Sequence, residues 1–302
     1  MGFRFRQDES IPCAARRMAR EELDRTLRDL QAASGDGLDA AVHNARRRLK
    51  RLRSLLRLFR HELGAEVYAR ENACFRTCAS CLSAARDARV LADTFAALAE
   101  PPPSRRQAPA FNTVANFLRQ RHGDESDRAR ALRRAVPRVA RQLRTARRRV
   151  RSWPLFADTW ESVGCGLRKT HRRCRRLGAL AVESGRPEAC HAWRKFVKYL
   201  WHQTEMLSPA WPEVLRPLAT QWRALATLLG RHHDLELLAT ALKRDAKALG
   251  GEAALKPVLA RIRARQQEVH TQACQLAARL FSEKTSAYER RLRVCWEAWR
   301  NG

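Results

Sequence analysis

The chain has 302 residues, of which 60 are Lys or Arg and 31 are Asp or Glu, so its net charge at pH 7 is +29. Hydrophobic residues make up 45% of the sequence, which excludes a disordered tail and allows one large domain or two ordinary ones. A globular protein this basic repels itself unless a polyanion neutralises it, and the charge therefore favours a polyanionic partner.

The predicted elements are all helices. Ile occurs only as Ile11 and Ile262, whereas Leu, Ala and Arg, which are good helix formers, fill long stretches. No run with alternating polarity is long enough to predict a strand. Turn-forming Gly and Pro clusters separate the helical segments. In chain order we expect helices at 11–33, 39–62, 66–99, 109–121, 125–151, 155–183, 187–207, 211–249, 254–282 and 285–300.

The sequence also lacks the features of a membrane or exported protein. Its longest run without a charged residue is 107–118, far short of the roughly 20 apolar residues that a spanning helix needs. The first residues contain no apolar signal core. The nine cysteines are an odd number, which predicts free thiols in a reducing compartment. We therefore expect a cytoplasmic protein without membrane contact.

One sequence pattern occurs twice. Residues 43–52 reappear at 191–200 as H-x-x-R-[RK]-x-[LV]-K-x-L, at a spacing of 148 residues. A second pair of similar segments, around Asp87 and Asp234, follows at a spacing of 147 residues. Two matching pairs of segments in the same order and at nearly the same spacing indicate an internal duplication. The predicted fold class is therefore all-α, with helical bundles at 11–152 and 155–300 that are related by a pseudo-two-fold axis.

The helix predicted at 39–62 is amphipathic. At 100° per residue its cationic side chains fall within about 120° of arc, and its leucines fall roughly opposite. The stretch 43–57 contains no acidic residue, although solvated faces normally mix both signs because like charges at i and i+4 repel. A polyanion-binding face is favoured, and a plain solvated face is the alternative. The cations of this face are His43, Arg46, Arg47, Lys50, Arg53 and Arg57.

The helix predicted at 187–207 repeats this arrangement, and the segment 155–183 adds arginines that match those of the first helix at the repeat spacing. The first helix also contains acidic residues, so its contribution is the weaker one. The basic run 147–151 fits binding and simple solubility equally well. The additional candidates are His191, Arg194, Lys195, Lys198 and His202, with Arg168, Arg172, Arg173 and Arg176, and with Arg20 and Arg28 of the first helix.

Together these motifs resemble the CHAD family, the conserved-histidine α-helical domain. The resemblance rests on segments 43–52 and 191–200 and on the segments around Asp87 and Asp234, and it covers nearly the whole chain. It implies two similar helical bundles that face each other, with basic residues of both around a central groove or pore. Residues 1–302 would then form a single domain of this kind.

The resemblance also implies a function, which is the binding of inorganic polyphosphate, at polyphosphate granules and beside polyphosphate-metabolising proteins. Asp87 and Asp234 are expected to be structural, as helix caps or as partners of the arginines. Arg86 precedes the first aspartate as in the family, whereas His233 precedes the second, which leaves the arginine's role open there. By motif position the phosphate contacts would be His43, Arg46, Arg47 and Lys50, and His191, Arg194, Lys195 and Lys198.

Some members of the family carry a fused triphosphatase domain with a Glu-x-Glu-x-Lys signature. The sequence contains no such triplet and no glycine-rich nucleotide loop. We therefore expect a stand-alone binding module and not an enzyme, with no catalytic residue, no cofactor and no metal.

Two clusters suggest other chemistry and are set aside. Cys74, Cys78 and Cys81 have the spacing of a radical-SAM iron–sulfur motif, but on a helix these positions share one face, where cysteine packs as a small hydrophobe. His232 and His233 suggest a metal site, but no further ligands stand at a recognisable spacing. The tryptophans within the helical patterns are assigned to packing.

Three alternative functions are also consistent with the high positive charge. Non-specific nucleic-acid binding is the first, although no helix-turn-helix, zinc-finger or RNA-binding pattern is visible. The second is an enzyme that acts on polyphosphate or organic phosphates, but such chemistry usually needs clustered carboxylates, which the basic faces lack. An acidic protein partner is the third.

Overall fold

The computed structural model describes residues 2–33, 37–82, 87–121 and 125–302. These residues form α-helices and three short 3-10 helices, and no strand occurs among them. The helices are α1 (Ile11–Ala32), α2 (Gly37–Leu58), α3 (Arg60–Cys81), α4 (Asp87–Leu98), α5 (Ala108–Arg121), α6 (Glu125–Arg149), α7 (Trp160–Ser184), α8 (Pro187–Leu207), α9 (Pro212–Arg244), α10 (Glu252–Leu280) and α11 (Thr285–Asn301).

The predicted all-helical fold is confirmed, with changes in several helix bounds. The segment predicted as a helix at 39–62 is α2 only as far as Leu58, and α3 begins at Arg60. The segment predicted as one helix at 66–99 is divided between α3 and α4. Helix α7 begins at Trp160 and not at 155, after an irregular stretch. Helix α9 ends at Arg244, where the 3-10 turn Ala246–Leu249 takes over. The break predicted at Gly64 is a kink inside α3, where this residue has a φ of 72°.

Local sequence signals account for the helix ends. The Ser10 hydroxyl accepts a hydrogen bond from the Cys13 backbone N–H at 3.4 Å and caps the start of α1. Helix α7 ends before Gly185, and α8 begins two residues later at Pro187. Glycine after a helix end and proline at a helix start are the preferred arrangement. The turn between α7 and α8 was therefore predictable from these residues.

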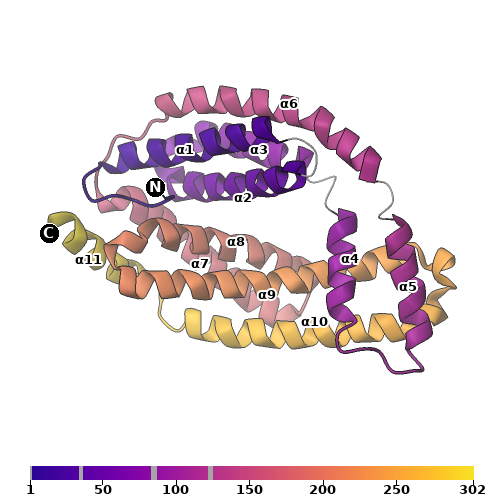
Figure 1. Ribbon diagram of the computed structural model, residues 1–302. Coiled ribbons are helices and arrows are strands. Elements are labelled where there is room, and N and C mark those ends of the chain that lie inside the picture. The colour runs from indigo at the N-terminus through magenta and orange to yellow at the C-terminus, as the bar shows by residue number, and fades with distance from the viewer. Residues whose placement is uncertain (1, 34–36, 83–86, 122–124) are drawn as a thin grey trace.

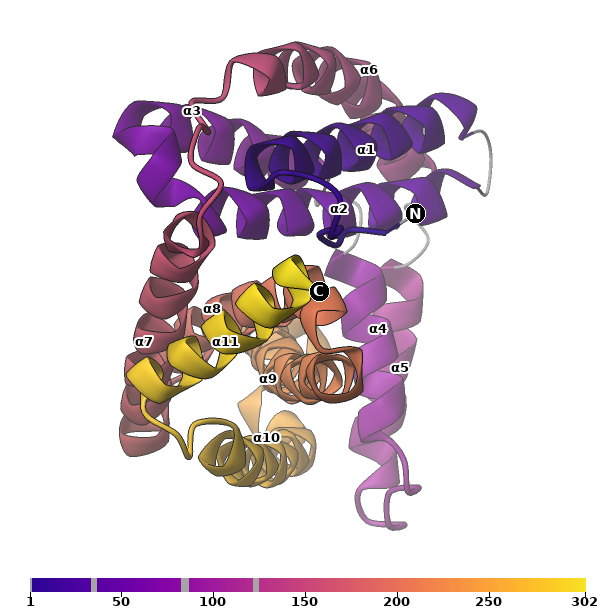
Figure 2. The ribbon, with the colours of Figure 1, turned by 90° about the vertical axis from the view of Figure 1, so that its left-hand side faces the viewer.

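The helices form two layers that cross. Helices α1, α2, α3 and α6 make one layer, and α7 to α11 make most of the other (Figure 1). In Figure 2, α9 and α10 are seen nearly end-on, whereas α2 and α3 run across the view. Helix α2 packs against both α7 and α8. The Ser54 hydroxyl of α2 donates to the Tyr199 carbonyl of α8 at 3.0 Å, so the two helices with predicted basic faces meet inside the molecule.

Helices α4 and α5 pack mainly against the second layer and not against the first. They stand at one end of the molecule and pack against α9 and α10 (Figure 1). A second hydrophobic core forms there, from Phe111 and Val114 of α5 together with Leu238 of α9 and Ile262 of α10. Part of the predicted bundle 11–152 thus shares a core with the second half. The internal duplication itself remains a prediction.

The main core is built from the apolar faces that the sequence predicts. Leu49, Leu52 and Leu55 of α2 are each 0% exposed, and burial of a leucine contributes roughly 1.5–3 kcal/mol. Trp193 and Trp222 are also 0% exposed, which confirms that they are packing residues. In the part of the chain that the structure describes, no helix is long and apolar enough to cross a membrane.

Candidate polyanion-binding site

The six cations predicted on one face of α2, which we call the α2 basic face, are His43, Arg46, Arg47, Lys50, Arg53 and Arg57. His43 and Arg47 are exposed and the other four are half-buried. The Arg46 guanidinium donates to the Ala79 carbonyl at 3.4 Å, and the Arg53 Nε donates to the Asn72 side-chain carbonyl at 3.0 Å. Both acceptors belong to α3, so the α2 basic face follows the side of α2 that borders α3.

Arg57, at the end of this face, connects three helices. Its guanidinium donates to the Tyr68 hydroxyl of α3 at 3.0 Å. It also lies over the rings of Phe196 and Tyr199 of α8, at 4.8 and 4.7 Å from their centroids. Such cation–π contacts each stabilise by about 0.5–2 kcal/mol. Arg57 therefore holds the two layers together as well as contributing positive charge.

The corresponding cations of the second half, which we call the α8 basic face, are His191, Arg194, Lys195 and Lys198. Lys195 is exposed and the others are half-buried. Arg194 and Lys198 line a recess of about 260 Å³ between α8 and α9. The recess also contains Arg223 and Arg231 of α9 and one carboxylate, Asp234. Its charge is therefore strongly positive, which is what a phosphate group needs.

Gly230 leaves the room for Arg194 in this recess. A Cβ atom at position 230 would lie 3.2 Å from the Arg194 Nη2, closer than most side-chain contacts allow. The glycine therefore lets the guanidinium approach α9 at position 230. The ring of His191 lies against that of His233 of α9, with 4.4 Å between the ring centroids, so the α8 basic face borders α9 as the α2 basic face borders α3.

The electrostatics of His191 follow from this crowding. Burial, and then the neighbouring charges of Lys195, His233 and Arg194, lower its pKa to about 4. The pKa of His233 is lowered as well, by burial and by Arg194 and Lys198. Both rings are therefore neutral at pH 7, and a phosphate bound beside them would favour the protonated form.

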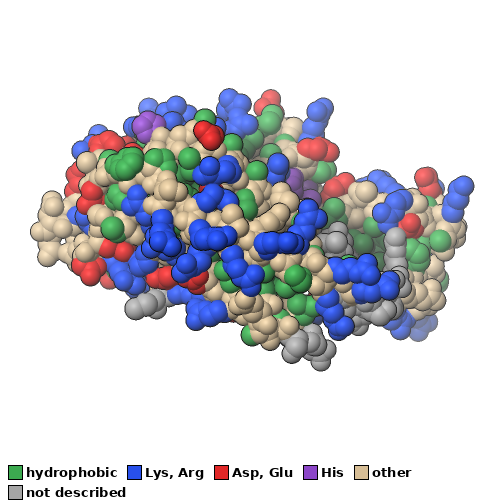
Figure 3. Space-filling view, turned by 90° about the horizontal axis from the view of Figure 1, so that it is seen from above, with side chains coloured by type: hydrophobic (Ala, Val, Ile, Leu, Met, Phe, Trp, Pro, Cys, Tyr) green, Lys and Arg blue, Asp and Glu red, His purple; other side chains and the backbone are tan. Residues whose placement is uncertain are grey.

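Helices α2 and α8 both begin at the end of the molecule where α4 and α5 stand (Figure 1). The motif segment 43–50 occupies the middle of α2, and the segment 191–198 lies in the first half and middle of α8. Lys and Arg side chains are also spread over much of the face of the first layer (Figure 3). The positive charge is thus not confined to α2 and α8.

His202, which the sequence assigns to the α8 basic face, lies elsewhere. It is 3% exposed, its Nδ1 lies 3.0 Å from a Glu205 carboxylate oxygen, and its ring stacks on Trp201. Burial lowers its pKa, which the carboxylate of Glu205 opposes. A buried ring with a carboxylate partner does not reach an anion at the surface, and we leave His202 out of the candidate site.

The candidates on α1 and α7 are not among the residues that line the α8–α9 recess. On α1, Arg20 is half-buried and Arg28 is exposed. On α7, Arg168 lies 3.9 Å from the carboxylate of Glu289 of α11. Arg172, Arg173 and Arg176 are exposed along α7. They would act as outer charges and not as contacts within the recess.

The basic run 147–151 is partly used for packing. Arg147 is ion-paired with Asp24 of α1. Arg149 binds Glu71 of α3 through both carboxylate oxygens, at 2.7 and 2.9 Å. Glu71 is 0% exposed. These pairs fasten α6 to the helices beneath it, so we exclude Arg147 and Arg149 from the candidate site.

Sequence reasoning missed a second basic recess, of about 550 Å³ between α3 and α6. Arg70, Arg138, Arg141 and Arg149 line it together with Cys74. A hydrogen bond with Cys78, and the charge of Arg149, lower the pKa of Cys74 to about 7. The arginines stand on helices far apart in the sequence, so no local pattern could have revealed them. Cys78 is buried, as predicted for a packing residue.

Arg86 lies outside the described residues, and Asp87 begins α4. The predicted structural role of Asp87 therefore stays a prediction. Asp234 lies in the α8–α9 recess, where its carboxylate is placed among arginines, as expected for a partner of these residues.

The family model described as CHAD domain matches residues 17–243, and the chain belongs to the CHAD domain family. Among solved structures, it is similar to the crystal structure of the CHAD domain from the plant Ricinus communis, with a TM-score of 0.66 and 18% sequence identity over 93% of this chain and 95% of that chain. At this identity the likeness concerns the fold alone. No curated protein sequence matches the chain.

Proposed function

We propose that this protein binds inorganic polyphosphate along the α2 and α8 basic faces, as a binding module without catalytic activity. Membership of the CHAD family supports this proposal, and so does the net charge of +29. Within the cell the protein would sit on polyphosphate granules, beside proteins that make or degrade polyphosphate.

The observation that carries the proposal is the contrast between neighbouring cations. Arg47, Arg53 and Arg57 of α2 and Lys195 of α8 have no ion-pair partner among the described residues. Arg48, on the other side of α2, lies 2.6 Å from the carboxylate of Asp29. Because unneutralised cations repel one another, these four cations would gain free energy from an external anion.

The mechanism rests on guanidinium and ammonium groups that contact successive phosphates. Arginine presents a planar fork of donors that fits phosphate oxygens, and lysine adds a point charge. Each contact releases condensed counterions, so affinity falls steeply as salt rises. The neutral ring of His191 would donate one hydrogen bond to a phosphate oxygen. No base stacking is needed, since polyphosphate has no bases.

Titration of long-chain polyphosphate at two salt concentrations tests the proposal. The variant combines Arg46→Ala, Arg47→Ala, Arg194→Ala and Lys195→Ala. By analogy with phosphate contacts in nucleic-acid complexes, each lost contact lowers the salt slope by about 1, and binding at moderate salt weakens by at least roughly 100-fold. A matched control removes four exposed cations from the outer helix α6, through Arg133→Ala, Arg134→Ala, Arg144→Ala and Arg148→Ala.

The control variant retains most of the wild-type affinity if the basic faces form the site. Equal losses in both variants would contradict the proposal, because they would show binding by net charge alone. Competition with DNA distinguishes this proposal from nucleic-acid binding, the main alternative. At matched phosphate concentration, polyphosphate displaces DNA from a polyphosphate-binding site, whereas a nucleic-acid-binding protein keeps its DNA bound.

A further inference from the structure

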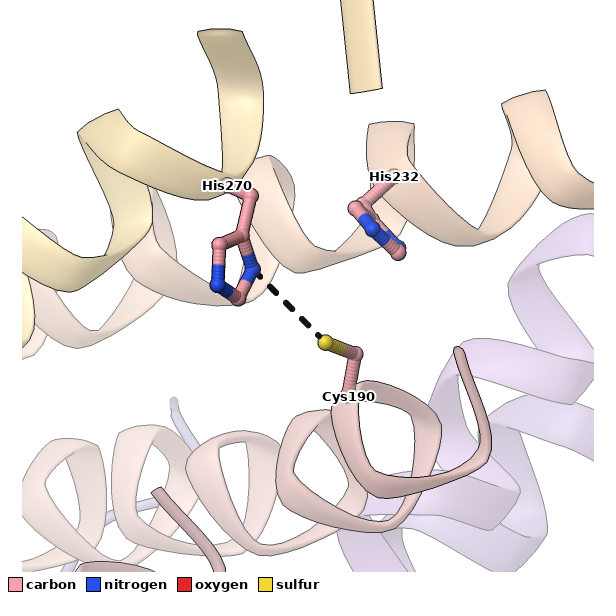
Figure 4. A group of neighbouring side chains, drawn as sticks. All are labelled: Cys190, His232 and His270. Carbon is pink, nitrogen blue, oxygen red and sulfur yellow. Dashed lines mark hydrogen bonds between the residues drawn. The ribbon is translucent and has the colours of Figure 1, made fainter. Parts of the chain in front are cut away.

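Three side chains outside the basic faces meet between the first turn of α8 and the helices α9 and α10. They are Cys190 of α8, His232 of α9 and His270 of α10 (Figure 4). Each offers one potential ligand atom, and these atoms all lie within 4.8 Å of one another. Cys190 is 1% exposed and His232 is 6% exposed, while His270 is half-buried. A thiol and two imidazoles thus converge from three helices in a place mostly shielded from water.

Both ring nitrogens of His270 have sulfur neighbours. Its Nδ1 lies 3.8 Å from the Cys190 Sγ (Figure 4), and its Nε2 lies 3.5 Å from the Sγ of Cys274, one turn further along α10. If the Nε2–H donates to Cys274, the Nδ1 lone pair points toward Cys190. Metal-binding histidines are commonly held in this way, by a hydrogen bond from the ring nitrogen that does not bind the metal.

His232 supplies an independent observation. Its Nδ1 is buried and has no hydrogen-bond partner among the described residues. Leaving a buried polar atom without a partner is costly, and a bound metal ion would satisfy this requirement.

The ligand types select the class of metal. Thiolate and imidazole favour Zn²⁺ and other borderline or soft ions, whereas Mg²⁺ and Ca²⁺ require oxygen ligands. At Zn–S and Zn–N distances of about 2.3 and 2.0 Å, tetrahedral ligand atoms stand roughly 3.3–3.7 Å apart. The 3.8 Å between the Cys190 Sγ and the His270 Nδ1 is close to this range, and the ligand atoms, which lie within 4.8 Å of one another, would draw together on binding by up to about 1.5 Å.

We propose that Cys190, His232 and His270 form a Zn²⁺ site that joins α8, α9 and α10. On binding, the metal takes the place of the Cys190 thiol proton, which is released to solvent, and water fills the fourth position. Cys274 holds the ring of His270 and is a positioning residue. The site does not depend on the proposed polyphosphate function. Because Cys190 directly precedes His191, a bound metal would also hold the first residue of the α8 basic face in place.

Cobalt substitution tests the proposal. Full-length protein, reduced and freed of metal by a chelator, is titrated with Co²⁺ and then with Zn²⁺. We expect one Co²⁺ per chain with a thiolate-to-cobalt charge-transfer band, which Zn²⁺ abolishes by displacement. Cys190→Ser removes the band, and His232→Gln and His270→Gln each weaken binding by more than about 100-fold, whereas Cys274→Ser weakens it by about 10-fold and keeps the band.

Cys295→Ser on α11 and Cys74→Ser on α3 are matched controls that keep both the band and the affinity. Circular dichroism of each metal-free variant shows whether it is folded, and Zn²⁺ raises the melting temperature of the wild type but not that of folded Cys190→Ser. Co²⁺ binding with wild-type affinity in folded Cys190→Ser or His270→Gln would overturn the proposal. Absence of the charge-transfer band in the wild type would overturn it as well.

Discussion

Arg47 and Arg51 stand four residues apart on α2, yet their surroundings are opposite. Arg47 is exposed and has no ion-pair partner among the described residues. Arg51 lies 3.7 Å from the buried carboxylate of Glu22 and 4.0 Å from that of Glu205. Arginine therefore has two uses in this protein: some arginines pair with a carboxylate and connect helices, and others are surface charges that form no ion pair. Net charge alone does not separate them.

Glu71 is the clearest case of the first use. It is 0% exposed and binds Arg149 with two hydrogen bonds and Arg70 with one, at 3.1 Å. Glu71→Ala leaves Arg149 without its carboxylate, and removal of one partner of a buried pair costs about 3–5 kcal/mol. Urea unfolding measures this loss. Glu66→Ala, at an exposed position of the same helix, should change stability by less than about 0.5 kcal/mol.

His171 gives the protein a predictable weakness in acid. The residue is 0% exposed, stacks on Tyr288 at 4.3 Å between ring centroids, and contacts the Thr285 hydroxyl at 2.9 Å. Burial lowers its pKa, the charge of Glu283 opposes this, and Arg175 and Arg291 add to it, so that the pKa falls from 6.5 to about 4. Below about pH 6.5 the unfolded chain binds a proton that the folded chain does not, so the free energy of unfolding falls down to about pH 4.

The fall attributable to His171 is on the order of 3 kcal/mol, since one pKa unit corresponds to about 1.4 kcal/mol. His171→Phe should flatten the dependence of unfolding free energy on pH between 7 and 4, as measured by urea unfolding at several pH values. His61→Gln, at an exposed position, serves as the control. An unchanged slope in His171→Phe would show that other groups cause the acid sensitivity.

At the scale of elements, the sequence predicted most helices because the signals are local. Amphipathic periodicity and the Gly185–Pro187 turn act over a few residues, and the buried leucines of α2 were identified from the wheel alone. The division between α3 and α4 was missed, because the segment 66–99 contains no proline or glycine to mark it. The packing of α4 and α5 on α9 and α10 was also missed, since it depends on contacts between residues more than a hundred positions apart.

The crossing of α2 and α7 depends on Gly166. A Cβ atom at this position would lie 1.8 Å from the Leu58 carbonyl oxygen of α2, and a backbone atom cannot move aside without shifting the helix. Gly166→Ala should therefore destabilise the protein by at least about 2 kcal/mol through overpacking. Gly37→Ala, where a Cβ would meet nothing within 4 Å, should be neutral or stabilising by up to about 1 kcal/mol. Thermal unfolding distinguishes the two, and equal stability would mean that the layers lie further apart.

At the scale of the whole molecule, the two candidate faces were predicted from a sequence pattern that occurs twice, whereas the contacts around each face depend on how the helices pack. The recess that contains Arg194 needs α9 beside α8, and Gly230 gives the Arg194 side chain room there. The cluster of Cys190, His232 and His270 needs three helices at once, and so no spacing rule could have identified it. The positive charge was predictable, and the lowered pKa of His191, which depends on burial and on neighbours from α9, was not.

The central claim is that both basic faces bind one polyphosphate chain, and half-variants test it most directly. One variant carries Arg46→Ala with Arg47→Ala, the other Arg194→Ala with Lys195→Ala, and the third combines them. Polyphosphate affinity is measured by titration calorimetry at fixed salt, with a chain long enough to reach both faces. The account predicts that each half-variant binds roughly 10-fold more weakly than wild type and that the combined variant shows about the sum of both free-energy losses. Wild-type affinity in either half-variant would contradict it, since that face would then contribute nothing.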